Sequence, residues 1–440
     1  MKSVCFFIKF VLYFCIFMWY YKIKSVGGCR MKILNFGSCN IDFVYTLDHI
    51  VGAGETETIE KMNIFPGGKG LNQSIALARA GASVYHAGCV GEDGEMLLSL
   101  LRENGVDVSG IKRVYGKNGH AIIQVSREGE NCIFIYPGSN AMITEELADS
   151  VLDGFEKGDY IILQNEISNI DYIVKKAFQK GMLIVLNPSP CNESIKKIDL
   201  GAVSYLVLNE IEAEILSGCS EPELSLKYFA ERYPDMRVVL TLGKRGSVFS
   251  YKSTEIFQPS FRVETVDTTA AGDTFTGYFI AKLAAGSDVA ESLRIAAAAA
   301  AIAVSRNGAA PSVPLISEVM AAIDGMRQNE SGDKSERLRE TTNLYILWNL
   351  KHASADGLAK ELGYSVTHTQ GIVKKIYGKP FSKVVQEKRC SAAAKLLKET
   401  DLSVGEIINS VGYENESFFR RLFKEKFGVN MLEYRNLSKK

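Results

Sequence analysis

The sequence lacks the marks of several common protein classes. Its nine cysteines are scattered through 440 residues, with no CxxC pair and no zinc-ligand spacing, so reduced thiols in a cytosolic protein are expected. No GxxxxGK[ST] loop occurs anywhere, which excludes a P-loop kinase as far as a motif can. Charge of neither sign is in excess, because 51 Lys and Arg balance 51 Asp and Glu.

This overall neutrality hides an uneven distribution of charge. From Lys334 onward the chain has 20 basic and 12 acidic residues, whereas the residues before it include 31 basic and 39 acidic ones. A chain of 440 residues also exceeds the usual size of one hydrophobic core. The sequence therefore predicts an acidic globular domain joined to a basic domain that has an anionic partner.

The first thirty residues allow three interpretations. Residues 5–21 form an apolar run that contains Lys9 and is short for a membrane span, which needs about 20 apolar residues. The run also fits a signal peptide, with small residues from Ser25 onward for a cleavage site. The third interpretation, which we favour, is that translation begins at Met31, because the preceding glycine codons fit a ribosome-binding sequence. Residues 1–30 are then a leader outside the fold, and we expect a cytoplasmic protein with no membrane partner.

Within a domain placed at residues 31–325, strand-like and helix-like runs alternate from Gly158 onward, a pattern typical of a parallel sheet with helices on both faces. Polar residues follow the ends of these strands, where ligands bind in such sheets. The predicted strands are residues 33–36, 160–163, 183–186, 205–208 and 238–242, and the polar residues are Asn40, Asp42, Glu166, Asn187, Asn209, Glu212, Thr241 and Gly243. An Asx turn is the plain structural alternative for Asn40 and Asp42.

Three segments of alternating hydrophobicity are predicted to form the antiparallel strands of a small lid. The sequence PGGKGLN at 66–72 lies between the first two and leads into an alanine-rich helix over residues 73–80. Its glycines let the backbone approach a small polyhydroxylated ligand, and Lys69 and Asn72 can supply hydrogen bonds. The predicted lid strands are residues 57–65, 120–126 and 131–136.

The nine residues 267–275, DTTAAGDTF, place small residues directly before an aspartate and an amphipathic run. Ala270, Ala271 and Gly272 leave room for an anion against first-turn N–H groups, at the positive end of a helix dipole. Asp273 would lie beside that anion, where a carboxylate can take a proton from an attacking hydroxyl. The plain alternative is that Asp273 only caps a helix.

Six further motifs accompany this segment: GSCNID at 37–42, GGKGLNQS at 67–74, QNE at 164–166, NEIE at 209–212, TLGKRG at 241–246 and RNGAAPSVP at 306–314. Together they resemble the motifs of the ribokinase-like sugar kinases of the PfkB family, over residues 31 to about 322. The resemblance implies an α/β fold, a ribokinase-like parallel-sheet sandwich with a small β lid. It also implies phosphorylation of a sugar by ATP.

The resemblance assigns a role to each matching residue. Asp273 is implied as the general base, with Ala270, Ala271 and Gly272 as the anion hole. The implied sugar ligands are Asn40, Asp42, Gly68, Lys69, Asn72, Glu166 and Asp273. The implied nucleotide ligands are Asn209, Thr241, Gly243, Gly246 and Gly272, and Glu212 acts with Asn209 on phosphate and Mg²⁺.

The resemblance further implies a potassium site formed by two neighbouring loop segments. The implied residues are Asp267, Thr269, Ala303, Arg306, Gly308 and Ser312. Two positions depart from the family pattern. Tyr278 stands where a small residue is expected, and Ala297 replaces a polar residue that is common near the adenine.

A polar segment without aromatic residues, 327–340, is typical of an exposed linker, and we place the linker at residues 326–342. Residues 343–440 contain two similar halves, each with two helices joined by a turn at a glycine. Two such helix-turn-helix units can present their second helices to successive major grooves. The predicted helices are residues 356–362, 365–377, 381–398, 403–411 and 415–427.

The segment VGYENESFFRRLFKEKFGVNMLEYR at 411–435 resembles the AraC/XylS-type DNA-binding domain, which implies an all-α double helix-turn-helix domain. A solvated basic helix is the plain alternative. The first unit departs from the pattern at Thr369 and Gly371, and the second has Asn430-Met431 where the family has Thr-Pro, so DNA binding is expected to depend mostly on the second unit. The implied phosphate contacts are Arg420, Arg421, Lys424 and Lys426, and Glu414, Asn415, Glu416 and Ser417 lie nearer base edges.

The sequence thus predicts an ATP-dependent kinase that converts D-ribose to D-ribose 5-phosphate with Mg²⁺ and K⁺, forms a homodimer through the lid, and binds DNA. Another sugar or a nucleoside stays open as the substrate. A hypothesis of a different class is a transcription regulator that uses the kinase fold as a sugar sensor. The retention of Asp273 and Gly272 favours the enzyme.

Overall fold

The computed structural model describes residues 31–252, 254–329, 338–339, 341–343, 345–346, 349–400 and 402–438. The chain forms two compact units that divide between Ile323 and Asp324. The expected leader at 1–30 lies outside the described residues, as does most of the expected linker. The domain boundaries at 31–325, 326–342 and 343–440 therefore stay predictions.

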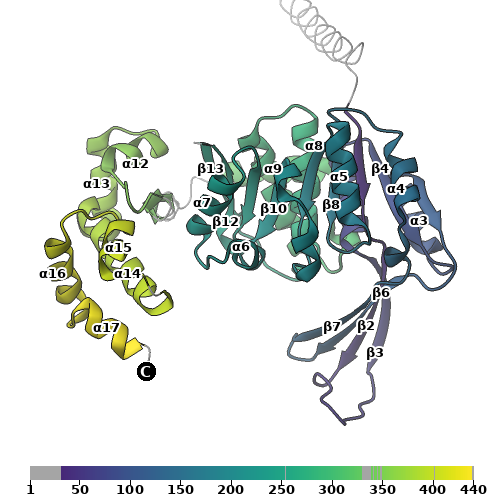
Figure 1. Ribbon diagram of the computed structural model, residues 1–440, viewed down its shortest axis with the longest axis horizontal. Coiled ribbons are helices and arrows are strands. Elements are labelled where there is room, and N and C mark those ends of the chain that lie inside the picture. Colours follow the sequence, from purple (N-terminus) through teal and green to yellow (C-terminus); the bar gives the residue numbers. More distant parts are fainter. Residues whose placement is uncertain are drawn as a thin grey trace, which may run out of the picture. The chain divides into compact units, whose positions relative to one another are not determined.

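The first unit is built on a nine-stranded sheet in the order β13-β12-β11-β10-β9-β8-β1-β4-β5. The strands from β11 to β5 run parallel, and β12 and β13 pair antiparallel at one edge (Figure 1). The five predicted strands are confirmed to within one residue. The bounds are β1 Ile33–Phe36, β4 Val84–Val90, β5 Asp107–Arg113, β8 Tyr160–Gln164, β9 Leu183–Asn187, β10 Tyr205–Asn209, β11 Arg237–Thr241, β12 Gly246–Tyr251 and β13 Thr254–Pro259.

Helices cover both faces of this sheet, as the alternating pattern predicts for strands that are buried on both sides. One face packs against α2, α8, α9 and α10 in a single apolar core. Helices α5 and α6 follow the strands β8 and β10, α7 precedes β11, and all three lie over the other face (Figure 1). The bounds are α2 Lys69–Arg79, α3 Glu95–Glu103, α4 Glu145–Leu152, α5 Ile170–Lys180, α6 Glu210–Ser217, α7 Pro222–Arg232, α8 Ala271–Ala284, α9 Val289–Val304 and α10 Ile316–Asn329.

Helices α2 and α8 pack closely, which brings two of the sequence motifs together. A Cβ on Gly277 would lie 2.5 Å from the Cβ of Ala76, so only glycine fits at this crossing. At the next residue, the departure at Tyr278 is explained: its ring is fully buried, and its hydroxyl donates to the Pro314 carbonyl at 2.6 Å. The large residue ties α8 to the segment before α10 and leaves the packing with α2 intact.

A four-stranded sheet in the order β3-β2-β6-β7 projects from the edge of the first unit as the lid (Figure 1). Its strands are β2 Asn40–Leu47, β3 Lys61–Gly67, β6 Gly119–Ser126 and β7 Asn131–Tyr136. The prediction missed β2 and began β3 four residues early. Alternation along β2 is weak because its middle residues are half-buried on both faces, whereas its i and i+2 residues, Asn40 and Asp42, do share one face.

The second unit is helical, as predicted. Its helices are α12 Ala355–Leu362, α13 Val366–Tyr377, α14 Phe381–Glu399, α15 Val404–Ser410, α16 Glu416–Phe427 and α17 Met431–Ser438. The turns at Gly363 and Gly412 have φ of 68° and 88°, which favours glycine. Asn430, at the departure from Thr-Pro, accepts a hydrogen bond from the Glu433 N–H at 2.9 Å and so keeps a polar cap before α17.

The two helix-turn-helix units have different cores. Phe419, Phe423 and Phe427 of the second helix-turn-helix unit pack with Tyr434, with ring centroids 4.6 to 6.4 Å apart. The first helix-turn-helix unit is built around aliphatic residues such as Val373. The hydroxyl of its Thr369 is buried without a hydrogen-bond partner among the described residues. None of the described helices combines the length and hydrophobicity that crossing a membrane requires.

Candidate functional site

Helix α8 begins at a cavity of about 220 Å³ without any side-chain cap. Its N-cap residue, Ala270, has φ 58°, a left-handed conformation that residues with a Cβ rarely adopt. Ala271 and Gly272 line the same cavity, and a Cβ on Gly272 would meet no atom within 4 Å. The Ala271 N–H reaches only the Thr268 carbonyl, at 3.3 Å. The small residues therefore leave the helix start open to an anionic ligand.

Asp273 lies in the first turn of α8 and is buried at the edge of this cavity. Its carboxylate does not cap the helix. Asn72 donates from Nδ2 to Oδ2 at 3.0 Å, and Gln73 donates from Nε2 to Oδ1 at 2.9 Å. Both donors come from α2, so the close packing of α2 on α8 positions the carboxylate.

Five residues predicted to bind sugar surround the junction of the lid with the sheet: Asn40, Asp42, Gly68, Lys69 and Glu166. The side chain of Glu166 accepts from the Ser38 hydroxyl and, at 3.0 Å, from the Lys69 backbone N–H. Asn40 accepts from Asn140 Nδ2 at 2.7 Å. Gly68 precedes α2 with φ 92°, and a Cβ there would lie 2.9 Å from the Asn40 nitrogen.

Burial and mutual repulsion perturb the titratable groups of this region. Burial, with the neighbouring charge of Glu166, raises the pKa of Asp42 to about 7. Burial also raises the pKa of Glu166. For Lys69, burial acts to lower the pKa, but the charges of Asp273, Glu166 and Glu212 outweigh burial and raise it. The ammonium group is thus held charged among carboxylates, as a cluster that binds a neutral polyol beside a phosphate requires.

One amide oxygen in this cluster has no partner. The Oδ1 atom of Asn72 is buried and accepts no hydrogen bond from the described residues, although the same side chain donates to Asp273. A buried acceptor without a donor is costly. A ligand hydroxyl would satisfy it.

A second cavity, of about 670 Å³, adjoins the first at Thr241, Thr268, Ala271 and Gly272, which line both. The structure therefore brings together four of the five predicted nucleotide ligands, Thr241, Gly243, Gly246 and Gly272. The sequence reasoning missed the apolar walls, because all of their residues except Phe275 lie outside the motifs. The wall residues are Phe261, Val263, Phe275, Ala300, Ala301 and Val304, with Ala297 beside them.

The remaining predicted nucleotide ligand, Asn209, lies with Glu212 at the smaller cavity, where the two form a capping box at the start of α6. The Glu212 N–H donates to Asn209 Oδ1 at 2.9 Å, and the Asn209 N–H donates to Glu212 Oε2 at 3.0 Å. One oxygen of each side chain is thus occupied by the helix start. The second Glu212 oxygen remains for a ligand.

The residues predicted to hold potassium are only partly drawn together. Asp267 accepts from the Thr269 N–H at 2.8 Å and from the Gly308 N–H at 2.9 Å, which joins the two loops. Burial acts to raise the pKa of Asp267, but these hydrogen bonds outweigh it and lower the pKa. The Arg306 side chain instead pairs with Glu318 at 2.6 Å. Ser312 donates to Ala309, and the Ala303 carbonyl accepts from the Arg306 N–H at 3.0 Å.

In the second unit, all eight residues predicted to contact DNA are exposed at the start of α16 or along it. The Lys426 ammonium donates to the Glu387 carbonyl and the Ser391 hydroxyl of α14. Asn415 caps α16, because its Oδ1 accepts from the Phe418 N–H at 3.0 Å. Glu416 pairs with Arg420 at 2.9 Å, and the Arg421 guanidinium lies 5.5 Å from the Phe418 ring centroid. Ser417 and Lys424 complete the exposed face.

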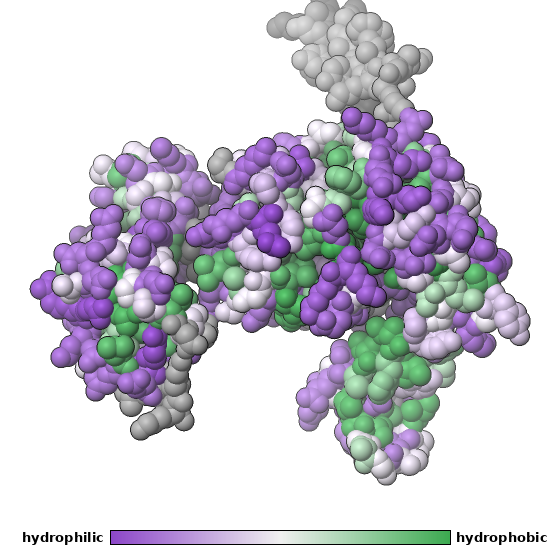
Figure 2. Space-filling model, viewed as in Figure 1, coloured by the Kyte–Doolittle hydropathy of each residue, from purple (hydrophilic) through white to green (hydrophobic). Residues whose placement is uncertain are grey.

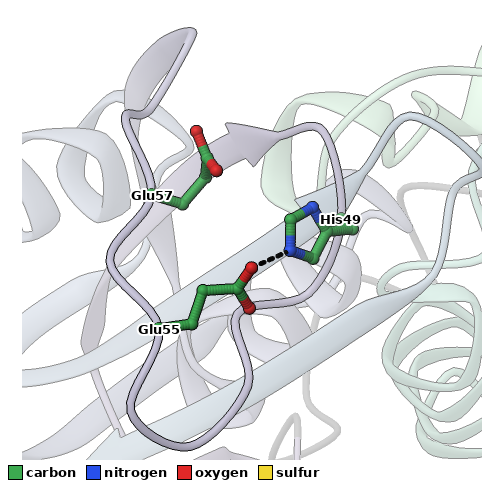
Figure 3. A group of neighbouring side chains, drawn as sticks. All are labelled: His49, Glu55 and Glu57. Atoms are coloured by element: carbon green, nitrogen blue, oxygen red, sulfur yellow. Dashed lines mark hydrogen bonds and ion pairs between the residues drawn. The ribbon is translucent and has the colours of Figure 1, made fainter.

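Outside both cavities, His49, Glu55 and Glu57 gather in the loop between β2 and β3 (Figure 3). His49 and Glu55 are joined by a 2.7 Å contact, which raises the pKa of the imidazole. All three side chains are exposed. The contact therefore organises the lid loop and belongs to neither cavity.

Comparisons with known proteins agree with this geometry. Residues 30–316 match the model of the pfkB family of carbohydrate kinases, and residues 358–437 match a helix-turn-helix domain. The chain is 39% identical over 293 residues to a ribokinase of Bacillus subtilis, covering 66% of this chain and 98% of the relative.

Solved structures give the same result. A Thermotoga maritima ribokinase superposes with a TM-score of 0.61 at 33% identity, covering 67% of this chain and 99% of the other. An Arabidopsis thaliana ribokinase complexed with ribose and ATP superposes with a TM-score of 0.59 at 27% identity, covering 66% and 98%.

Proposed function

Because the chain belongs to the pfkB family of carbohydrate kinases, we propose that it transfers the terminal phosphate of ATP to D-ribose, giving D-ribose 5-phosphate and ADP. The observation that carries the proposal is the pairing of Asp273, held by two amide donors, with the uncapped start of α8. A base and an anion site then lie side by side, as phosphoryl transfer to a hydroxyl requires.

In this proposal, each residue of the site has a role that follows from its position. The sugar binds against Asn40, Asp42, Gly68, Lys69, Asn72 and Glu166, and ribose hydroxyls satisfy the free Asn72 oxygen. Asp273 takes the proton of the terminal hydroxyl as that oxygen attacks phosphorus. The amides of Ala270, Ala271 and Gly272 stabilise the charge on the transferred phosphoryl group. ATP occupies the larger cavity, with Thr241, Gly243 and Gly246 along it.

Two ions belong to the proposal. Asn209 and Glu212 would hold Mg²⁺, which neutralises phosphate charge when bound. The donor set fits, since carboxylate oxygens suit Mg²⁺ and Glu212 has one oxygen outside its capping box. For K⁺, both Asp267 oxygens already accept hydrogen bonds, so backbone carbonyls of the 267–269 and 303–312 segments supply most ligands.

A panel of sugars tests the substrate. Turnover is measured on ribose, deoxyribose, fructose and adenosine with ATP, and the highest kcat/KM is expected on ribose. The relatives include a deoxyribokinase of Salmonella typhi at 28% identity, so deoxyribose is the sharpest competitor. A higher kcat/KM on any other substrate would reject ribose while leaving a sugar kinase.

The lid carries a face suited to dimerisation. Figure 2 shows hydrophobic residues gathered over the lid strands. The strand register places Met62, Ile64 and Phe134 on one face of this sheet, and all three are about half exposed. Apolar patches of this kind mark interaction surfaces. The proposal therefore includes a homodimer through the lid, and replacing Ile64 and Phe134 by aspartate is expected to give a monomer in sedimentation analysis.

The helix-turn-helix match and its capped, basic α16 support a second activity: DNA binding by the domain placed at 343–440, after a linker at 326–342 and a kinase domain at 31–325. Both ATP and DNA are reached in the cytoplasm, where we place the protein. If sugar binding alters dimerisation, paired DNA-binding domains gain effective concentration on two half-sites.

The coupling is tested by titrating promoter DNA with and without ribose and a non-hydrolysable ATP analogue, at fixed salt. A change in DNA affinity of about 1 to 3 kcal/mol is expected. Equal affinities in all four conditions would leave two independent activities on one chain. ATP turnover measured on the same samples separates this enzyme from a sensor that only binds sugar.

A further inference from the structure

Gln73 occupies a place in the site that no motif role assigns to it. It follows Asn72 on α2, is fully buried, and donates from Nε2 to Asp273 Oδ1 at 2.9 Å and to Asn187 Oδ1 at 3.2 Å. With Asn72 on Oδ2, each oxygen of the Asp273 carboxylate receives one amide N–H. The orientation of the Gln73 amide therefore decides whether Asp273 meets a donor or an acceptor.

A chain of amides fixes that orientation from one side. Asn35 donates from Nδ2 to the Gly70 carbonyl at 2.7 Å, so its Oδ1 must be the acceptor. Gln164 Nε2 donates to this Oδ1 at 2.9 Å and to Gln73 Oε1 at 2.8 Å. Gln73 thus presents its oxygen to Gln164 and its nitrogen to Asp273. All four groups are buried.

The other side imposes the same polarity. Asn187 donates from Nδ2 to the Val207 carbonyl at 3.0 Å, which leaves its Oδ1 to accept from Gln73. A backbone carbonyl can only accept. The carbonyls at Gly70 and Val207 therefore anchor both ends of this chain of amides, which we call the relay. The amide assignments of the four side chains between them follow without ambiguity: Asn35, Gln164, Gln73 and Asn187.

The relay leaves one acceptor unsatisfied. Gln164 Oε1 is buried and has no hydrogen-bond partner among the described residues. Turning this amide over would place its oxygen against the oxygens of Asn35 and Gln73, and two acceptors facing each other lose both hydrogen bonds. The unsatisfied oxygen is the cost of aiming both Gln164 N–H groups into the relay.

We propose that Gln73 is a positioning residue for the reaction, and that Asn35 and Gln164 act through it by setting its polarity. The N–H delivered by Gln73 holds the Asp273 carboxylate in the plane and protonation form in which it can accept the proton of the sugar hydroxyl. This inference rests on the proposed role of Asp273 as the base. Gln73 itself touches neither substrate in the proposed arrangement.

The first test replaces Gln73 by methionine, which keeps the volume and removes the donor. We expect kcat to fall about 10- to 100-fold, while the calorimetric dissociation constants for ribose and ATP stay within about twofold. The Gln73→Glu variant places an acceptor against Asp273, and its kcat should be lower still. Ser292→Ala is the matched control: Ser292 is equally buried, and its hydroxyl donates to the Asp288 carbonyl at the start of α9, at 2.7 Å, so this change leaves the hydrogen bonds of Asn35, Gln164 and Gln73 intact. It should keep the wild-type kcat.

The second test separates positioning from general packing. Gln164→Met should also lower kcat, although Gln164 does not touch Asp273, because the Gln73 amide becomes free to turn over. In the Asp273→Asn background, Gln73→Met should add no further loss. Loss of activity in Asp273→Asn with wild-type kcat in Gln73→Met and Gln164→Met would overturn this inference alone. Equal rates for wild type and Asp273→Asn would overturn the proposed function as well.

Discussion

Helices α8 and α6 begin at the same small cavity, yet their first turns are completed in opposite ways. The start of α6 is closed by the reciprocal hydrogen bonds of Asn209 and Glu212. The start of α8 has a left-handed alanine, two small residues and no side-chain cap. A capped start stabilises its own helix, whereas an open one is completed only when a ligand arrives.

The same contrast extends to the second unit. Helices α12, α13, α15 and α16 are each capped by a serine or asparagine side chain. The helix that we propose faces DNA, α16, therefore keeps its structure without a partner, and under this proposal its affinity comes from exposed cations. Carboxylates at helix starts consequently differ in role. Asp273 accepts hydrogen bonds from side chains of another helix, α2, whereas Glu212 caps the start of its own helix, α6.

The largest effect is expected at the open start. Asp273→Asn should lower kcat about 10²- to 10⁴-fold, the usual contribution of a general base, while calorimetry still detects ribose binding. The control is Asp288→Asn, because Asp288 caps α9 through a hydrogen bond from the Glu291 N–H and asparagine caps equally well. A kcat near that of the wild type would remove Asp273 as the base.

Asp42 differs from Asp273 in having no amide donor among the described residues, and its pKa of about 7 makes the site sensitive to pH. The folded protein keeps this proton up to about pH 7, whereas an unfolded aspartate releases it near pH 4. The stability from this group is thus fully present below about pH 4 and is lost as pH rises through about 7.

Urea unfolding between pH 5 and 8 measures this loss, which is at most about 1.4 kcal/mol for each pH unit within the window. Asp42→Asn should flatten the dependence on pH. Ribose affinity should change in the opposite sense, increasing as pH rises through about 7, because sugar hydroxyls donate to the ionised carboxylate. Identical pH profiles for wild type and variant would contradict the assignment.

Two variants separate the capping role of Glu212 at the start of α6 from its proposed role in binding Mg²⁺. Glu212→Gln keeps an acceptor at the third helical position, so the capping box survives, but it removes the charge proposed for Mg²⁺. We expect an unchanged melting temperature and a higher Mg²⁺ concentration for half-maximal activity. Glu212→Ala loses both and should also unfold earlier, by about 1 kcal/mol. If the Gln variant needs no more Mg²⁺ than the wild type, Glu212 is only a cap.

On α16 the prediction concerns charge. Arg420→Ala should weaken binding about equally on all DNA sequences and reduce the slope of log affinity against log salt by about 1, as loss of one phosphate contact does. Lys426→Ala is the control. The resemblance implied a phosphate contact for Lys426 too, but its ammonium donates to the Glu387 carbonyl and the Ser391 hydroxyl of α14, so its loss should not change the slope. Fluorescence anisotropy at several salt concentrations measures the salt slope of DNA affinity for both variants.

Much of the fold could be predicted because its signals are local. Buried strands such as 205–208 and the glycine turns of the helix-turn-helix units depend on residues that are neighbours in sequence. The motifs also located Asp273 and Gly272 correctly at one cavity. Strand β2 was missed because a half-buried strand lacks a clear period.

Other features of the site could not be read from the sequence because they join distant residues. Gln164 and Gln73 are 91 positions apart, and nothing local to either indicates that they share a hydrogen bond. The apolar wall of the nucleotide cavity, with Phe261 and Phe275, likewise forms only when the sheet edge meets α8 and α9. Equally, Glu212 fits a metal ligand and a cap by its spacing alone, and only the geometry showed the capping box.

The smallest expected effect compares an open and a closed helix start directly, with one substitution at each N-cap. Ala270→Gly relieves a left-handed alanine and should stabilise the first unit by up to about 1 kcal/mol, with ribose kinase activity retained. Asn415→Ala removes the cap of α16 and should destabilise the second unit by about 1 kcal/mol. Thermal unfolding of the full chain, followed by hydrogen exchange in each unit, measures both. Destabilisation by Ala270→Gly would show that the open start is stabilised by its alanine and is not held under strain for a ligand.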